Sequence, residues 1–287
     1  MAKRILNFVR YRFLLFAGLL PYFLGAAVSY YDTGNFDFGL FVIGLAGLFF
    51  VLVGVEAFNE YFDWILGTDR VFQINPGPIT KKKFYTGVAA FFVALIFAVY
   101  LTTKVGTGIA IFAVIGFIAA AGYLGPPIRF TYRGLGEIVI ALSYGPFMVL
   151  GSYYLQTTEF SMTPLLVSII PAIMLFEIAI MNEVPDFLQD GLVGKKNLCV
   201  RLGRETIVKL YGLLMLLVFL ACAAGIIAGI FPKAVWLTMI LAPLAYRNYN
   251  TARRSYETPQ LFLAAVRGTI IFYLAVTIIF ILAFLYI

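Results

Sequence analysis

Histidine is missing from this sequence, and both cysteine and charge are scarce. The 287 residues include no histidine, two cysteines and only 12% charged residues. The lack of histidine excludes histidine-ligated zinc, haem or iron and any histidine general base. Cys199 and Cys222 stand far apart in different contexts, so they predict neither a disulfide framework nor a paired-cysteine metal site. Oxygen ligands remain for a metal, and these suit Mg²⁺ or Ca²⁺.

Hydrophobic residues, in contrast, make up 62% of the chain, and the mean hydropathy is +0.97. A soluble domain is about 45–50% apolar and about 25% charged, so the composition predicts a polytopic membrane protein. Apolar runs of about twenty residues favour helices over the shorter strands of a barrel. We expect an all-α fold, with residues 1–287 forming a single domain of nine transmembrane helices in one bundle. The expected spans lie near 13–31, 39–58, 84–103, 107–123, 136–155, 164–181, 207–229, 232–249 and 263–286.

The basic residues are distributed unequally between the two sides that these nine spans define. Of the 21 lysines and arginines, only Lys104 and Lys233 fall opposite the N-terminus. Because basic loops stay in the cytoplasm, we expect a multi-pass protein of the cell membrane with a cytoplasmic N-terminus. The net charge of +7 is therefore explained by topology and by contacts with membrane lipid head groups, and no nucleic-acid partner is expected.

Two acidic motifs follow the second and sixth apolar runs. The first runs from Asn59 to Arg70, and the second, 123 residues later, runs from Asn182 to Asp190; both begin N-E-x-x-D. Side chains four apart share one face of a helix, and Gly67 offers a place for the first helix to end. Both motifs are expected on the cytoplasmic side, where they predict one shared active site. The main candidates for binding a metal are Asn59, Asp63, Asp69, Asp186 and Asp190.

Converging carboxylates repel one another unless a cation neutralises them, and Mg²⁺ is bound by a few carboxylates together with substrate phosphates. Fixed positive charges surround the motifs, so a diphosphate bridged by Mg²⁺ fits this constellation. No GxxxxGK[ST] loop is present, which disfavours a nucleotide and favours a diphosphate attached to a lipid. A cation-coupled membrane transporter is an alternative of a different class. Its ion sites are expected near the bilayer midplane, whereas these acids lie at helix ends.

At these residues the chain resembles the UbiA superfamily of intramembrane prenyltransferases, which carries N-D-x-x-D-x₃₋₅-D after the second helix and D-x-x-x-D after the sixth. Here the motifs are Asn59-Glu-x-x-Asp63-x₅-Asp69 and Asp186-x₃-Asp190, with Glu60 where the family more often has Asp. The resemblance covers most of the chain and includes 123–129, 132–137 and 194–203. It implies an enzyme that transfers alkyl or aryl groups other than methyl, here a prenyl group, from a polyprenyl diphosphate to an acceptor.

The resemblance also implies roles for individual residues. The five candidates above would hold Mg²⁺ and, through it, the diphosphate, with Asp63 and Asp186 essential to catalysis. Tyr123 would stabilise positive charge near the reacting carbon. The residues expected to bind substrate are Arg10, Asn59, Arg70, Arg129, Asn182 and Lys195.

The acceptor is the remaining question. The segments at 59–69 and 123–137 look most like the 1,4-dihydroxy-2-naphthoate prenyltransferases of menaquinone biosynthesis, in which the aromatic acceptor loses a carboxylate and gains the prenyl chain on carbon. Alternatives within the family are a geranylgeranylglyceryl phosphate geranylgeranyltransferase, with a glyceryl phosphate acceptor, and a 4-hydroxybenzoate prenyltransferase. In those enzymes an N-R-P-x-R-P run usually follows the first motif, and Asn75-Pro-Gly-Pro-Ile79 echoes it only in part.

Overall fold

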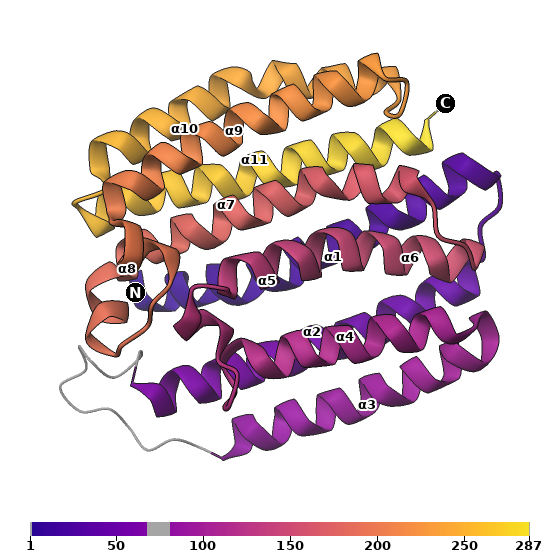
Figure 1. Ribbon diagram of the computed structural model, residues 1–287, viewed down its shortest axis with the longest axis horizontal. Coiled ribbons are helices and arrows are strands. Elements are labelled where there is room, and N and C mark those ends of the chain that lie inside the picture. The colour runs from indigo at the N-terminus through magenta and orange to yellow at the C-terminus, as the bar shows by residue number, and fades with distance from the viewer. Residues whose placement is uncertain (1, 68–80, 287) are drawn as a thin grey trace.

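The chain folds into a bundle of long helices (Figure 1). The computed structural model describes residues 2–67 and 81–286, with side chains from Gly18 onward, and in this part it contains helices and no strands. The helices are α1 (Ala2–Thr33), α2 (Phe38–Leu66), α3 (Lys82–Val105), α4 (Thr107–Leu124), η1 (Phe130–Arg133), α5 (Gly136–Leu142), η2 (Ser143–Phe147), α6 (Met148–Thr157), α7 (Met162–Leu192), α8 (Leu198–Leu202), α9 (Arg204–Ile227), η3 (Lys233–Leu241), α10 (Ala242–Ser255) and α11 (Pro259–Leu285).

Seven spans in the described part are long and apolar enough to cross a membrane. They are α2, α3, α4, the continuous segment Gly136–Thr157, α7, α9 and α11. The multi-pass all-α fold is therefore confirmed, whereas the count of nine stays a prediction. The first expected span lies within α1, whose side chains are described only from Gly18. The eighth is divided between η3, a 3₁₀ helix, and α10.

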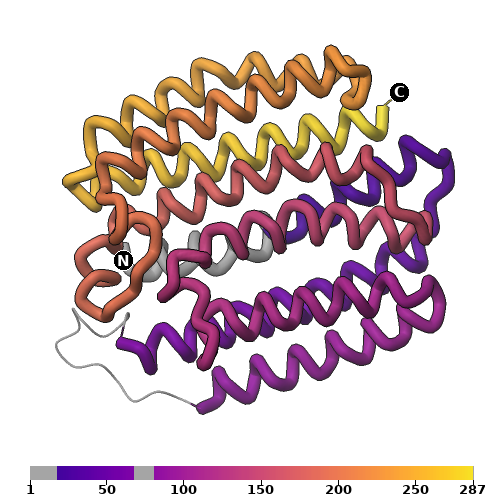
Figure 2. Tube along the Cα trace, viewed as in Figure 1, coloured from indigo at the N-terminus to yellow at the C-terminus, as the bar shows by residue number. Residues whose placement is uncertain are grey.

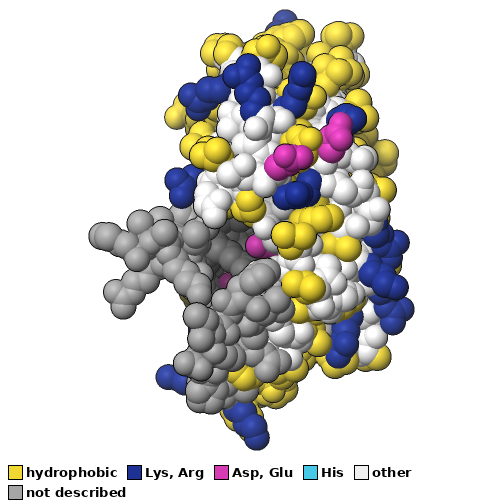
Figure 3. Space-filling view, turned by 90° about the vertical axis from the view of Figure 1, so that its left-hand side faces the viewer, with side chains coloured by type: hydrophobic (Ala, Val, Ile, Leu, Met, Phe, Trp, Pro, Cys, Tyr) yellow, Lys and Arg dark blue, Asp and Glu magenta, His cyan; other side chains and the backbone are white. Residues whose placement is uncertain are grey.

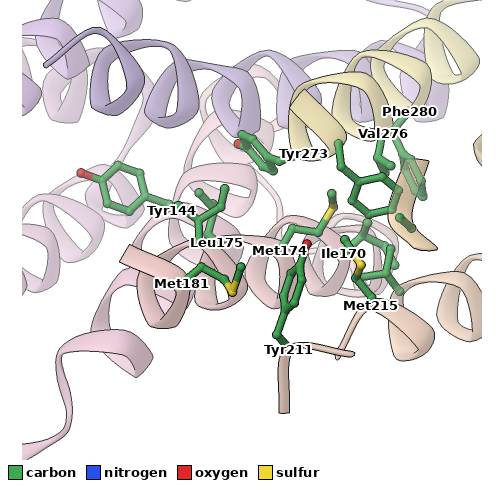
Figure 4. Close-up of a cluster of buried hydrophobic side chains, with 14 of the residues drawn as sticks. Tyr144, Ile170, Met174, Leu175, Met181, Tyr211, Met215, Tyr273, Val276 and Phe280 are labelled. Carbon is green, nitrogen blue, oxygen red and sulfur yellow. The ribbon is translucent and has the colours of Figure 1, made fainter. Parts of the chain in front are cut away.

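The core of the bundle lies between α1, α7, α9 and α11. Ile170 and Met174 of α7, Tyr211 of α9 and Phe280 of α11 pack together there, each no more than 2% exposed (Figure 4). The central helix is α7, because 61% of the residues in its most apolar 18-residue stretch are buried inside the protein. A helix that is apolar on all sides belongs in the centre of a bundle, where it positions whatever its polar end carries.

The ends of α2 and α7 meet at one end of the bundle, together with α8 and the start of α3 (Figure 1). Lysine and arginine side chains are spread over this end, and acidic side chains are visible in a hollow near its centre (Figure 3). Helix α2 begins at the other end, capped by the Asp37 carboxylate, which accepts a hydrogen bond from Leu40 N at 2.9 Å. This arrangement gathers the two acidic motifs at the basic end of the molecule.

Candidate functional site

A cavity of about 1240 Å³ runs into the bundle from this basic end. Its walls come from α2, α3, α4, α7 and α11, from the segment 136–157, and from the loop that leads to α8. Most of the lining is apolar, with phenylalanines such as Phe91 and Phe117 along α3 and α4. The acidic residues are grouped where α2 and α7 end. The cavity therefore combines a charged mouth with a long apolar interior.

The described part of the first motif begins on the last two turns of α2. Asn59 and Asp63 both line the cavity, as their helical spacing predicts. The helix ends at Leu66, and Gly67 follows in the left-handed conformation with φ of 93°. Gly67 N donates to Trp64 O at 3.3 Å, a helix end that glycine forms without steric cost.

The second motif lies on α7, which continues eleven residues beyond the expected end of its span. Asn182, Asp186 and Asp190 recur every four residues and all line the cavity. Pro185 is accommodated inside the helix. One face of α7 therefore presents an amide and two carboxylates to the face of α2 that carries Asn59 and Asp63.

Lys195 joins the two motifs. Its Nζ lies 3.2 Å from Asp63 Oδ1 and 3.4 Å from Asp190 Oδ1, and all three side chains are at most 11% exposed. Burial by itself lowers the pKa of Lys195, but the two carboxylates outweigh burial and raise this pKa above its ordinary value. Lys195 is therefore charged at neutral pH and offsets part of the negative charge of the acid pair. Asn197 adds a hydrogen bond from Nδ2 to Asp190 Oδ2 at 2.7 Å.

The oxygen donors of this site suit Mg²⁺ in their chemistry. Asn59, Asp63, Asp186 and Asp190 supply one amide and three carboxylates to one cavity, and Asp190 Oδ1 is buried without a hydrogen bond. Among the described residues, however, no group of three or more acidic or cysteine side chains is placed to hold a metal ion. The reason is visible in the contacts, because Lys195 lies between the carboxylates. The donor chemistry suits a divalent cation, and in the described arrangement the cation between Asp63 and Asp190 is the ammonium group of Lys195.

The glutamates at the second position of each motif have structural partners. Glu60 forms an ion pair with Lys83 at 2.7 Å, which ties α2 to α3. Glu183 Oε2 accepts a hydrogen bond from Cys199 N at 3.1 Å, at the start of α8. The replacement of the family's aspartate by Glu60 therefore falls on a position with an inter-helix role.

The other segments that carry the resemblance hold the mouth of the cavity together. Glu137 Oε1 accepts from Leu198 N at 2.7 Å, and Asn197 Oδ1 accepts from Val200 N at 2.8 Å. With Glu183, three side chains thus cap the first amides of α8. Arg201 adds bonds to Lys196 O and to Arg133 O, each at 2.7 Å.

A glycine is required where these two loops approach each other. Gly134 has φ of 70°, and a Cβ there would lie 2.8 Å from both Arg201 Nε and Lys196 O. A larger residue would be strained in its backbone and would separate the loops. The 132–137 and 194–203 segments are therefore positioning elements around the cavity.

The structure brings most of the described candidates to the cavity. The candidates that line it are Asn59, Asp63, Tyr123, Asn182, Asp186, Asp190 and Lys195. Arg129 does not; it has a positive φ of 50° and lies over the Tyr132 ring, 5.9 Å from the ring centroid. Asp69, Arg70 and the side chain of Arg10 lie outside the described residues.

Sequence reasoning missed several polar residues of the cavity, among them one acid, one amide and one arginine. Glu56 lies one turn before Asn59 on α2, Asn197 lies beside Asp190, and Arg267 lines the cavity from α11. Arg267 carried a signal that was available, since an arginine inside an apolar span is costly and usually functional. Asn197 carried none, because its role depends on how the loop folds back.

The fold and the cavity define a multi-pass membrane enzyme with two acidic helix ends at one site. A model of the UbiA prenyltransferase family matches residues 18–266, and the chain belongs to this family. It is therefore a transferase that moves prenyl groups, which decides against the cation-coupled transporter.

Curated relatives and solved structures agree with this assignment. The chain is 24% identical over 233 residues to the 1,4-dihydroxy-2-naphthoate octaprenyltransferase of Bacillus subtilis, covering 79% of this chain and 74% of that protein. It is 27% identical over 253 residues to the 2-carboxy-1,4-naphthoquinone phytyltransferase of Synechocystis, and this match covers 84% of this chain and 80% of that protein. A UbiA homolog from Aeropyrum pernix has the same fold, with a TM-score of 0.69, 15% identity and coverage of 93% and 95%. A UbiA homolog from Archaeoglobus fulgidus, solved with DMAPP and Mg²⁺, superimposes with a TM-score of 0.56 at 17% sequence identity. The match covers 93% of this chain and 98% of that one.

Proposed function

We propose that this chain transfers a prenyl group from a polyprenyl diphosphate to an aromatic acceptor, and that the acceptor is 1,4-dihydroxy-2-naphthoate in menaquinone biosynthesis. The observation that carries the proposal is the cavity that both motifs share, acidic at its mouth and apolar inside. The Bacillus subtilis relative, named for octaprenyl transfer to this naphthoate, supports the acceptor. We further propose that residues 1–287 act as one unit in the cell membrane, with the N-terminus and the site on the cytoplasmic side.

In this proposal the two motifs hold the diphosphate end of the donor. Asn59, Asp63, Asp186 and Asp190 would bind Mg²⁺, and Asp69 is proposed to complete the set. The Archaeoglobus fulgidus homolog solved with DMAPP and Mg²⁺ supports this use of the fold. Bound Mg²⁺ supplies Lewis-acid neutralisation of the diphosphate charge.

The chain's own groups orient the donor and stabilise the charges that develop. Lys195 would move from its ion pairs with Asp63 and Asp190 to the diphosphate oxygens, aided by Asn182, Arg10 and Arg70. These donors stabilise the departing diphosphate while the allylic C–O bond breaks.

The carbon that becomes positive lies, in this proposal, next to the ring of Tyr123, whose face stabilises a cation. The apolar walls of the cavity take up the isoprenoid tail. They also exclude water, which would otherwise capture the carbocation before the acceptor ring carbon attacks.

The test uses the purified full chain with Mg²⁺ and radiolabelled geranylgeranyl diphosphate. The acceptors dihydroxynaphthoate, 4-hydroxybenzoate and geranylgeranylglyceryl phosphate are supplied in separate reactions. We expect product with dihydroxynaphthoate alone, lost on adding EDTA and restored by excess Mg²⁺. Product with another acceptor would replace the acceptor assignment, and activity that persists in EDTA would refute the metal assignment.

The variant Asp186→Asn tests the second motif in the same assay. We expect turnover to fall by roughly a hundredfold or more, because a group that stabilises developing charge is lost. The matched control is Glu159→Gln, an exposed carboxylate at the opposite end of the bundle, which is expected to retain full activity. Near-normal turnover in Asp186→Asn would remove the second motif from the site.

A further inference from the structure

Arg267 is the single charged residue of the 27-residue helix α11. Its side chain is exposed and lines the cavity together with Leu263 and Ile270 of the same helix. Charge inside a membrane helix is costly, and it persists where it faces a cavity and has a partner. This raises the question of which group Arg267 meets.

No described residue forms an ion pair or a hydrogen bond with the Arg267 guanidinium. The other cation of the described cavity wall, Lys195, is bound by Asp63 and Asp190. Eight acidic or amide side chains of the two motifs line the same cavity, so the lack of a partner is not caused by a shortage of acceptors. Arg267 forms no ion pair with them and is available to an anion that enters the cavity.

The position of Arg267 along the bundle is level with the second motif. Helices α7 and α11 pack side by side and run in opposite directions (Figure 2). Arg267 lies eight residues after the start of α11, or about 12 Å along the axis. Asp186 and Asn182 lie six and ten residues before the end of α7, about 9 and 15 Å along its axis. Because the end of α7 and the start of α11 lie at the same end of the bundle (Figure 2), the backbone of Arg267 lies at about the depth of the second motif, on the α11 wall of the cavity.

We infer that Arg267 binds the carboxylate of the aromatic acceptor, an inference that rests on the proposed function. A planar guanidinium pairs with a carboxylate through two parallel hydrogen bonds. Leu263, Ile270 and Ile178 supply apolar surface to the same cavity, which suits the ring of an aromatic acid. The diphosphate of the donor is an alternative oxyanion, but the cation in contact with both acidic motifs is Lys195.

The chain offers a matched control in Arg247. This arginine is exposed, lies eight residues before the end of α10, and is not part of the cavity wall. Helix α10 packs against α11, so the two arginines reach a similar depth on neighbouring helices. A guanidinium that only contacts lipid head groups would give the same result at both positions.

The experiment measures binding to detergent-solubilised protein without any donor. The ligands are 1-hydroxy-2-naphthoate and 1-naphthol, which differ by the carboxylate, and affinity is followed by ligand fluorescence. We expect the unaltered protein to prefer the naphthoate, and Arg267→Gln to weaken its binding by roughly ten- to a hundredfold. Binding of 1-naphthol to Arg267→Gln and all binding to Arg247→Gln are expected to stay unchanged.

Three results would overturn the inference. The first is an equal loss in Arg267→Gln and Arg247→Gln, which would indicate a head-group contact. The second is weaker binding of inorganic diphosphate with Mg²⁺ in Arg267→Gln but unchanged naphthoate binding, which would assign Arg267 to the donor. The third is that the unaltered protein shows no preference for the carboxylate in either ligand pair. It would then bind 1-hydroxy-2-naphthoate and 1-naphthol with equal affinity, and likewise 4-hydroxybenzoate and phenol. The proposed function fails by a separate result, the lack of prenyl transfer to dihydroxynaphthoate.

Discussion

Lys195 shows how one residue keeps a charged site intact in an apolar bundle. Two carboxylates from different helices would repel each other if they were left alone in a medium of low dielectric constant. The ammonium group between Asp63 and Asp190 reduces this repulsion and links the ends of α2 and α7 through the loop that follows α7. The same group is proposed to contact the diphosphate, so binding of metal and donor is coupled to the release of Lys195.

Replacement of Lys195 by methionine is expected to destabilise the metal-free protein. Removing one partner of a buried ion pair costs about 3–5 kcal/mol because the other charges stay buried. The melting temperature in EDTA should therefore fall, and added Mg²⁺ should recover part of the loss. Since the pKa of Lys195 is raised, its contribution is complete below pH 10.5 and is lost only as the pH rises beyond that raised pKa.

The control for this prediction is Lys196→Met, because Lys196 is the exposed neighbour of Lys195. Its melting temperature is expected to match that of the unaltered protein. Equal melting temperatures for Lys195→Met and Lys196→Met would mean that the bridge contributes nothing to stability.

At the scale of elements, the five-residue helix α8 depends on side chains from elsewhere. A helix this short has no internal stability. Its first amides are satisfied by Asn197, by Glu137 and by Glu183 of α7. The loop that carries Lys195 leads into α8, so these caps also position the lysine.

Glu137→Ala is expected to loosen this region. The amide of Leu198 loses its acceptor, at a cost of about 1–3 kcal/mol, and amides in 194–203 should exchange their hydrogens faster. Glu205→Ala removes an exposed ion pair with Lys209 in the first turn of α9 and serves as the control. Exchange in 194–203 that is as slow as in the control would show that α8 does not need the Glu137 cap.

Helix α7 also contains a carboxyl group that nothing in the described structure satisfies. Glu177 is 0% exposed, and neither side-chain oxygen has a hydrogen-bond partner among the described residues. Replacement by methionine removes a buried unsatisfied group at nearly the same volume, so Glu177→Met is expected to gain about 1–3 kcal/mol of stability. A raised melting temperature, with Glu177→Gln showing a smaller gain, is the measurement that checks it. A lower melting temperature for Glu177→Met would instead assign the carboxyl group a stabilising role.

At the scale of the whole molecule, charge is divided between the two ends. Both acidic motifs and most of the basic residues lie at one end, whereas Lys104 closes α3 and Lys233 begins η3. Loops rich in lysine and arginine stay in the cytoplasm. We therefore expect the site to lie on the cytoplasmic side of the membrane.

Labelling of single introduced cysteines tests this orientation. With a membrane-impermeant maleimide on intact cells, Glu159→Cys is expected to react and Lys196→Cys to react only after the membrane is opened. The native thiols of Cys199 and Cys222 are fully buried, and burial raises the pKa of Cys199 to about 12, so they provide an unreactive background. Reaction of Lys196→Cys in intact cells would reverse the orientation.

The amino-acid sequence by itself determined the class of fold, the approximate positions of the apolar spans and the grouping of the acidic candidates on helix faces. These properties depend on hydropathy and on spacing along one helix: twenty apolar residues predict a span, and acids four apart share a face. Asn59 with Asp63, and Asp186 with Asp190, could be grouped in this way without knowledge of the packing.

Only the tertiary structure decided which groups meet across helices. The ion pairs of Lys195, the capping roles of Glu137 and Glu183, and the entry of Arg267 into the cavity all join residues from different helices or loops. The physical reason is that packing against neighbouring helices sets the rotation and depth of each helix. The spacing of residues along one helix does not determine these two quantities.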